Sequence, residues 1–258
     1  MSKFGILKIG VQFQTHAVSP SAFRELVGDV LDLGVDSVFL WDHLVPFTGI
    51  EGQVSWDTWT LLGSFAGVFR GREQVLGVLV SPLSIREPAM LARSAVTIAL
   101  LGNGSFVLGV GSGGFVHDDN LIDAPQDVSS RLNLFSRRLK FLRHEVSRLN
   151  TLFGTNVKLW VGGSGERVTI PSALKYADGW SGFGPPTEFG HKAKNFSQGD
   201  LEISVLLTPH DQENNLQAYV DAGAHHVIRS LRPNQQDTFD LLPISQMLSE
   251  RAQMIGSL

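Results

Sequence analysis

Four stretches of this chain decide its fold: Leu40-Trp41-Asp42-His43-Leu44, Val78-Leu79-Val80-Ser81-Pro82, Gly109-Val110-Gly111-Ser112-Gly113-Gly114 and Val161-Gly162-Gly163-Ser164-Gly165-Glu166. Each ends a hydrophobic run of the kind that forms β-strands, and each places small, polar or ionisable residues at the carboxyl end of that strand. In a parallel barrel these ends converge on one face, which carries the binding and catalytic groups. The four stretches therefore predict one ligand site assembled from several loops.

Two kinds of segment alternate along the whole chain. Runs rich in Val, Leu, Ile, Phe and Gly, typical of strands buried on both faces, cover residues 8–14, 36–42, 74–81, 105–112, 157–163, 178–184, 202–208 and 225–231. Segments with the hydrophobic period of helices cover residues 20–33, 56–69, 88–101, 130–149, 166–177, 187–196, 211–222 and 236–254. Strand-first alternation of this kind predicts an α/β fold, a single (β/α)8 TIM barrel domain over residues 1–258. A doubly wound sheet would leave the last two strand–helix units unexplained.

The composition narrows the class of protein. A formal charge of −4, without a cluster of Lys or Arg, argues against a nucleic-acid surface. The absence of cysteine excludes disulfides and thiolate metal sites and fits a cytoplasmic location. Neither a signal peptide nor an apolar run long enough to span a membrane is recognisable. We expect a cytoplasmic homodimer with a small-molecule substrate and with no nucleic-acid or membrane partner.

The glycines of the fourth strand match the dinucleotide fingerprint Gly109-x-Gly111-x-x-Gly114. That mechanism needs a helix at the last glycine, and the fingerprint normally follows the first strand of a domain. Here the motif follows the fourth strand, and we expect a long loop after Gly114. A glycine-lined wall that a flat ring can approach is therefore favoured over a dinucleotide site; a simple turn at the strand end is the other interpretation.

His43 closes the second strand and is the candidate catalytic residue. Imidazole can donate, accept or carry a proton near neutral pH. The competing interpretation is a structural histidine that bonds a neighbouring loop. The remaining histidines have no spacing typical of metal ligands, so no metal site is predicted.

The loop Gly162-Gly163-Ser164-Gly165 precedes a helix that we expect to begin near Glu166. Backbone N–H groups at a helix start, together with a hydroxyl, favour an anion such as a phosphate. A tight turn in which Glu166 satisfies the helix dipole is the alternative. Because no nucleophile elbow, Walker A motif or HExxH motif is present, the chemistry is expected to come from an organic cofactor.

Together, in this order, the four stretches resemble the luciferase-like superfamily of flavin- or deazaflavin-dependent oxidoreductases, whose fold is a TIM barrel. Asp42-His43 is similar to the Asp-His pair that ends strand 2 in many members that use coenzyme F420. Residues 159–167 and 173–180 form the most specific match, and the similarity runs from about residue 8 to residue 180. Gly114 departs from the pattern, because the sugar-phosphate dehydrogenase branch has a catalytic glutamate there.

The resemblance implies a binding mode. The cofactor ring would lie in the barrel mouth against strands 2 to 4, with its phosphate on the loop after strand 5. His43 would contact the ring or the exchangeable proton of the substrate, and Ser81 the ring or ribityl chain. The residues implied in cofactor binding are Asp42, Leu79, Val80, Ser81, Gly111, Gly113, Gly114, Gly162, Gly163, Ser164 and Gly165. A non-proline cis peptide bond is expected at or near Val78-Leu79.

The implied activity is hydride transfer between C5 of F420 and a small organic substrate. FMN is the alternative cofactor, in an FMN-dependent monooxygenase, and a flavin- or deazaflavin-binding protein without turnover is the second alternative. The connection Thr208-Pro209-His210-Asp211 is too short for the long lid that covers the mouth in several members, so we expect an open site or one closed by a partner subunit.

Overall fold

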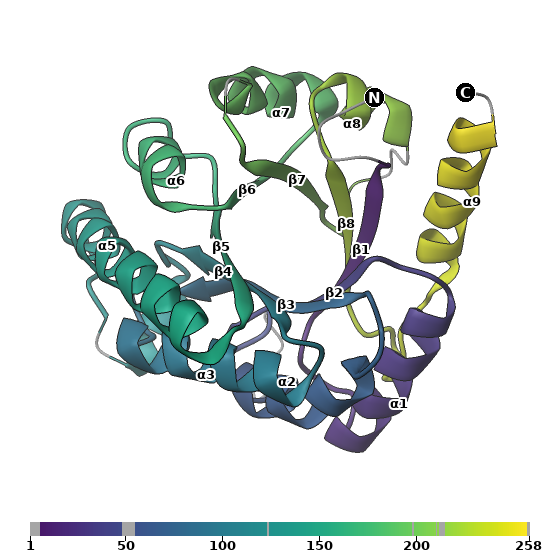
Figure 1. The fold of residues 1–258 in the computed structure, drawn as a ribbon, viewed down its shortest axis with the longest axis horizontal. Helices are drawn as coiled ribbons and strands as arrows, with labels where there is room; N and C mark the ends of the chain where they lie inside the picture. The colour runs from purple at the N-terminus through teal and green to yellow at the C-terminus, as the bar shows by residue number, and fades with distance from the viewer. Residues whose placement is uncertain are drawn as a thin grey trace.

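The computed structural model describes residues 6–47, 55–122, 124–197, 199–209, 211 and 215–256. Eight parallel strands follow one another in chain order around a closed barrel, and helices surround it (Figure 1). The ring closes where β1 pairs with β8. This confirms the predicted α/β TIM barrel and excludes a dinucleotide-binding sheet.

The eight strands lie within one or two residues of their predicted positions in most cases. They are β1 (Lys8–Phe13), β2 (Ser37–Leu40), β3 (Val75–Pro82), β4 (Ser105–Gly111), β5 (Asn156–Gly162), β6 (Gly179–Phe183), β7 (Glu202–Leu207) and β8 (His226–Leu231). Pairing between β3 and β4 shifts register between Val78 and Ser81, and the Leu79-Val80 peptide bond there is cis. The cis bond thus lies one residue beyond the predicted one.

The described helices are α1 (Pro20–Asp32), α2 (Thr58–Phe65), η1 (Ala66–Phe69), α3 (Pro88–Leu101), α4 (Val116–Leu121), α5 (Val128–Phe153), α6 (Thr169–Tyr176), α7 (Pro186–Ala193), η2 (Lys194–Phe196), α8 (Leu216–Asp221) and α9 (Leu242–Gly256). Side chains cap the beginnings of four of them, α1, α2, α5 and α8. Ser19 caps α1, as its position before Pro20 predicts, and its Oγ accepts from the N–H of Ala22 at 3.3 Å. None of the described helices is long and apolar enough to cross a membrane.

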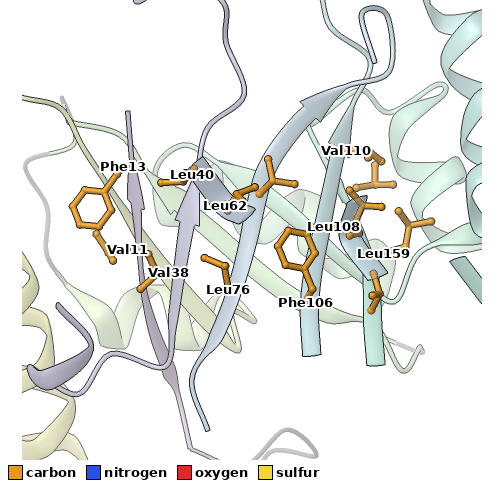
Figure 2. Close-up of a cluster of buried hydrophobic side chains, with 14 of the residues drawn as sticks. Val11, Phe13, Val38, Leu40, Leu62, Leu76, Phe106, Leu108, Val110 and Leu159 are labelled. Carbon is orange, nitrogen blue, oxygen red and sulfur yellow. The ribbon is translucent and has the colours of Figure 1, made fainter. Parts of the chain in front are cut away.

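Two layers of apolar side chains form the core. Residues pointing outward from the strands pack under the helices, as Val38 and Leu40 of β2 do (Figure 2). Between them Phe39 points into the barrel, where it packs with Leu79, Trp160 and other inward residues. This alternation follows from the pleat of a strand, and because both faces are covered, the strands read as continuous hydrophobic runs.

Several helix predictions were wrong, and among them α8 begins at Leu216 rather than at residue 211. The long loop expected after Gly114 contains α4, a helix too short to produce a recognisable hydrophobic period. The helix predicted to begin near Glu166 is α6, and it begins at Thr169 because residues 166–168 form a turn. The last begins at Leu242 rather than residue 236, because Asn234 Oδ1 accepts from the N–H groups of Gln236 and Thr238 and holds a turn there. Residues 210 and 212–214 of the connection after β7 lie outside the described part of the chain.

Candidate functional site

A cavity of about 480 Å³ opens at the carboxyl ends of the strands. It brings together eight of the predicted site residues, namely His43, Leu79, Val80, Gly111, Gly113, Gly114, Gly162 and Gly163. It does not bring Asp42, Ser81, Ser164 or Gly165 to its walls. The strand ends therefore converge on one face as the sequence indicates, although not every polar residue there faces the cavity.

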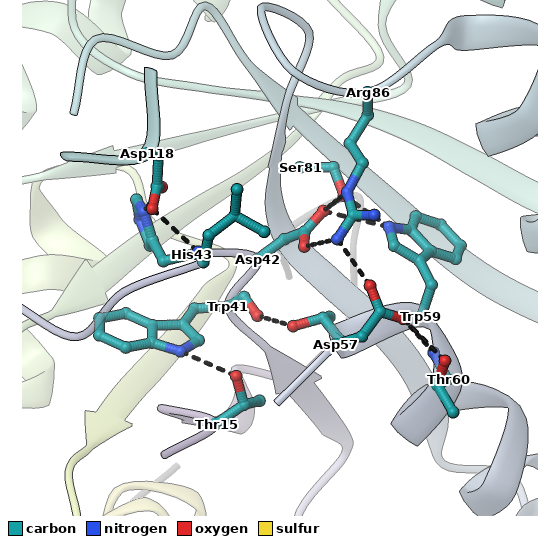
Figure 3. A network of polar contacts seen from close by, with 12 residues as sticks. Thr15, Trp41, Asp42, His43, Asp57, Trp59, Thr60, Ser81, Arg86 and Asp118 are labelled. Atoms are coloured by element: carbon teal, nitrogen blue, oxygen red, sulfur yellow. Dashed lines mark hydrogen bonds and ion pairs between the residues drawn. The ribbon is translucent and has the colours of Figure 1, made fainter. Parts of the chain in front are cut away.

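The carboxylate of Asp118 fixes the orientation of the His43 ring. His43 Nδ1 lies 2.6 Å from Oδ2 of Asp118 on α4, and the other carboxylate oxygen accepts from the N–H groups of Leu44 and Val45 at 2.9 and 3.1 Å (Figure 3). The Asp118 side chain is almost fully buried. In this arrangement Nδ1–H donates to the carboxylate, so Nε2 is the nitrogen left for a ligand in the cavity.

Aromatic rings enclose this histidine. The ring centroids of Trp41, Phe47 and Phe115 lie 4.9, 4.5 and 5.3 Å from that of His43. All three also line the cavity. They restrict access of water to the imidazole, which strengthens hydrogen bonds made there.

Asp42, predicted to bind the cofactor, does not line the cavity. It is 1% exposed, and its carboxylate accepts from Arg86 Nη2 at 2.6 Å and from Ser81 Oγ at 2.7 Å (Figure 3). Trp59 Nε1 donates to both Asp42 and Ser81. Burial acts to lower the pKa of Arg86, but its hydrogen bond and ion pair with Asp42, joined by Asp57, hold that pKa above its ordinary value. Asp42 and Ser81 therefore belong to a buried polar cluster behind the cavity wall.

The wall itself is built around Val80. A Cβ at Gly162 would lie 2.6 Å from Val80 Cγ1, and one at Gly111 would lie 2.9 Å from Cγ2. Glycine at these two positions therefore makes room for the valine side chain. Val80 in turn lines the cavity, so the three residues give it an apolar wall.

Positions 113 and 114 require glycine because of their backbone angles and, at 114, because of a neighbouring side chain. Their φ angles are +77° and +115°, a backbone region that other residues rarely adopt. A Cβ at Gly114 would lie 3.0 Å from the guanidinium of Arg131, which packs against this backbone. The position that carries a glutamate in the sugar-phosphate branch is therefore closed to any side chain unless Arg131 moves.

The loop after β5 differs from its prediction in one important respect. The Gly163 N–H, which we expected to be open to an anion, donates to the carbonyl of Ser181 at 3.0 Å. Because α6 begins only at Thr169, its N-terminus does not follow the glycines directly. The N–H groups of Ser164, Gly165 and Glu166 donate to no other described residue. The N–H donors left for an anion are thus those of Ser164 and Gly165, which the prediction included, and of Glu166, whereas the N–H of Gly163 is not available.

Sequence analysis missed Asp118 and several other cavity residues, among them Gln12, Phe47 and Phe115. Gln12 lies inside the barrel, with its amide oxygen 2.7 Å from Ser230 Oγ, while Phe47 and Phe115 flank His43. A polar residue at the carboxyl end of β1 was a usable signal for Gln12. The described part of the chain contains no group of three or more His, Asp or Glu side chains placed to hold a metal ion.

Comparison with known proteins places this barrel among relatives. The model of the luciferase-like monooxygenase family matches residues 3–236. The F420-dependent glucose-6-phosphate dehydrogenase of Amycolatopsis mediterranei (strain U-32) is 31% identical over 109 residues, 42% of this chain and 32% of that protein. The alignment thus spans about a third of the length of this curated relative.

Two solved structures show the same fold. An F420-dependent secondary alcohol dehydrogenase in complex with an F420-acetone adduct has a TM-score of 0.72 at 14% identity, over 90% of this chain and 95% of that one. The second is the oxygenating constituent of 3,6-diketocamphane monooxygenase from Pseudomonas putida, in complex with FMN. Its TM-score is 0.59 at 11% identity, over 86% of this chain and 66% of that one. At these identities the likeness concerns the fold, whereas the family match covers most of the sequence. The chain belongs to the luciferase-like monooxygenase family.

Proposed function

We propose that this protein is an F420-dependent oxidoreductase that transfers a hydride between C5 of the deazaflavin and a small organic substrate. The observation that carries the proposal is the His43–Asp118 pair, in which Nδ1 is bound to a buried carboxylate and Nε2 is left for the cavity. Hydride transfer to a carbonyl must be accompanied by a proton on its oxygen, and this nitrogen can supply it.

The cavity fits a planar ring with polar edges. Val80 offers an apolar surface, and glycine backbone on both sides of it leaves N–H and C=O groups within reach of ring substituents. Outside the cavity, next along the chain from its lining residue Gly163, the N–H groups of Ser164, Gly165 and Glu166 and the Ser164 hydroxyl suit a phosphate. No described Lys or Arg lines this cavity, and the carboxylates among its lining residues are those of Asp118 and Asp119.

When bound, the reduced deazaflavin supplies the hydride. His43 Nε2 gives a proton to the carbonyl oxygen in reduction and takes one from the hydroxyl in oxidation. Asp118 keeps the ring orientation fixed and stabilises the imidazolium in either direction. Trp41, Phe47 and Phe115 keep water away from the reacting atoms.

The comparisons support a deazaflavin more than FMN without deciding between them. The curated relative and the secondary alcohol dehydrogenase are both named as F420-dependent, while the diketocamphane monooxygenase holds FMN. An FMN-dependent monooxygenase is therefore the second candidate, on the strength of that complex.

Parallel anaerobic titrations with F420 and FMN, followed by tryptophan fluorescence, test the cofactor. Trp41 lines the cavity, so a bound ring should quench it. We expect F420 to bind at least tenfold more tightly than FMN. Equal or tighter binding of FMN would move the protein to the monooxygenase candidate. F420 binding without turnover on a broad panel of ketones and alcohols would favour a binding protein without catalysis.

A further inference from the structure

A second cavity adjoins the first at the barrel mouth, and we infer that it binds the substrate and selects oxo acids through Arg232. This inference rests on the proposed function, since it requires a cofactor in the first cavity. The second cavity has a volume of about 270 Å³ and lies at the carboxyl ends of β1, β7 and β8. It shares four lining residues with the first cavity: Gln12, Trp41, Phe47 and Leu206.

The shared residues mark the boundary at which substrate and cofactor would meet. Gln12 is fixed there, because its amide nitrogen donates to the carbonyl of Leu79 and its oxygen accepts from Ser230. Trp41 is fixed as well, since its Nε1 donates to Thr15 Oγ1 at 3.1 Å (Figure 3). A ligand in the second cavity therefore approaches the first across a preformed boundary, next to the aromatic rings around His43.

The lining of the second cavity combines apolar and polar side chains. Trp41, Phe47, Leu206 and Pro209 give it apolar surface. Gln14 and Arg232, which do not line the first cavity, add polar groups. Gln14 is 7% exposed, and its side-chain amide makes no hydrogen bond with any described residue. An amide donor left in this state suits a ligand oxygen.

Arg232 supplies the charge. It is the one Lys or Arg side chain among the described residues that line either cavity of the mouth. Other arginines near this face are engaged, Arg86 by Asp42 and Asp57 and Arg138 by Glu87. Arg232 makes no ion pair or side-chain hydrogen bond within the described chain, and the guanidinium is therefore available to a carboxylate, which it can bind in a two-point geometry.

The ligand that matches these groups has a carboxylate for Arg232, a short apolar spacer and a carbonyl at the boundary with the first cavity. In reduction, the carbonyl carbon gains the hydride of the reduced deazaflavin, and its oxygen gains the proton held by His43 Nε2. The π bond of C=O is replaced by new C–H and O–H bonds while the C–O single bond remains, so the oxo acid leaves as a hydroxy acid and the deazaflavin is left oxidised. His43 then regains its proton from solvent.

Steady-state kinetics with reduced F420 test the role of Arg232. The substrates compared are levulinate, its longer homologues and the methyl ester of each acid. We expect the acids to have a KM at least tenfold below that of their esters. Arg232→Gln should raise KM for the acids about 10- to 100-fold, with kcat and the ester KM nearly unchanged, and Arg232→Lys should restore part of the loss. Arg24→Gln, at an exposed position on α1, is the matched control and should change neither.

The outcomes separate this inference from the proposed function. If the esters are used as well as the acids, or if Arg232→Gln raises the Kd of F420 and not the KM of the acids, the carboxylate assignment is overturned. F420 binding with turnover of neutral ketones alone overturns it too and leaves the proposed function intact. If the protein does not bind F420 at all, the proposed function is overturned, and the inference that rests on it is overturned too.

Discussion

At the scale of single residues, the account depends on which nitrogen of His43 carries a proton. Asp118 Oδ1 accepts from two backbone N–H groups, so Asp118→Asn should keep its oxygen on that side and turn its NH₂ toward Nδ1. The neutral imidazole would then carry its proton on Nε2 and could no longer accept one there. We expect alcohol oxidation to fall about 10²–10³-fold, with cofactor affinity retained. Nitrogen-15 NMR of the ring should show the change of tautomer.

Asp119→Asn is the control for that substitution, because Asp119 lies next to Asp118 and bonds Ser84 at 3.2 Å rather than the histidine. It should leave both the ring tautomer and turnover close to wild type. An Asp118→Asn enzyme that oxidises alcohols at the normal rate would show that Nε2 takes no part as a base.

At the scale of elements, the close approach of β3, β4 and β5 around Val80 explains why glycine is found at positions 111 and 162. Gly162→Ala should destabilise the fold by about 1–3 kcal/mol, because its methyl group overlaps Val80. Adding Val80→Ala should recover most of that loss, and urea unfolding of the two single variants and the double variant measures the coupling. Gly28→Ala on α1, where nothing lies within 4 Å, is the control. Independent, additive effects of Gly162→Ala and Val80→Ala would rule out this packing.

The site residues that the sequence could predict are those marked by a local pattern within one element. Strand positions and the residues at strand ends are local signals, so His43, Val80 and the glycines at 111 and 162 were predictable. Asp118 was not, because it lies 75 residues from His43 on a six-residue helix without a hydrophobic period. Asp42 looked like a ligand group because sequence alone cannot show that Arg86 neutralises it.

For the molecule as a whole, an ion cluster joins the strands that close the barrel. At the amino-terminal end, Glu202 of β7 lies 2.9 Å from Lys8 Nζ of β1 and 3.4 Å from His226 Nδ1 of β8. Burial acts to raise the pKa of Glu202, but the close contact with His226 and the charge and hydrogen bond of Lys8 lower it to about 2. The folded pKa lies below the unfolded one, so the stabilisation is complete above about pH 4.5 and is lost as the pH falls toward 2.

Glu202→Gln tests this linkage. Denaturant unfolding should show a loss on the order of 2 kcal/mol relative to wild type near pH 7, allowing for the partial exposure of Lys8, and a smaller difference near pH 3. A difference of the same size at both pH values would mean that the charge of Glu202 does not stabilise the closed barrel.

The most direct test of the central claim is a single turnover with reduced F420 carrying deuterium at C5 and a ketone substrate, analysed by mass spectrometry and NMR of the product. The account predicts one deuterium on the carbinol carbon of the product, with His43→Ala slowing the transfer by about 10²–10⁴-fold. Product without deuterium, or consumption of oxygen in place of ketone reduction, would contradict it.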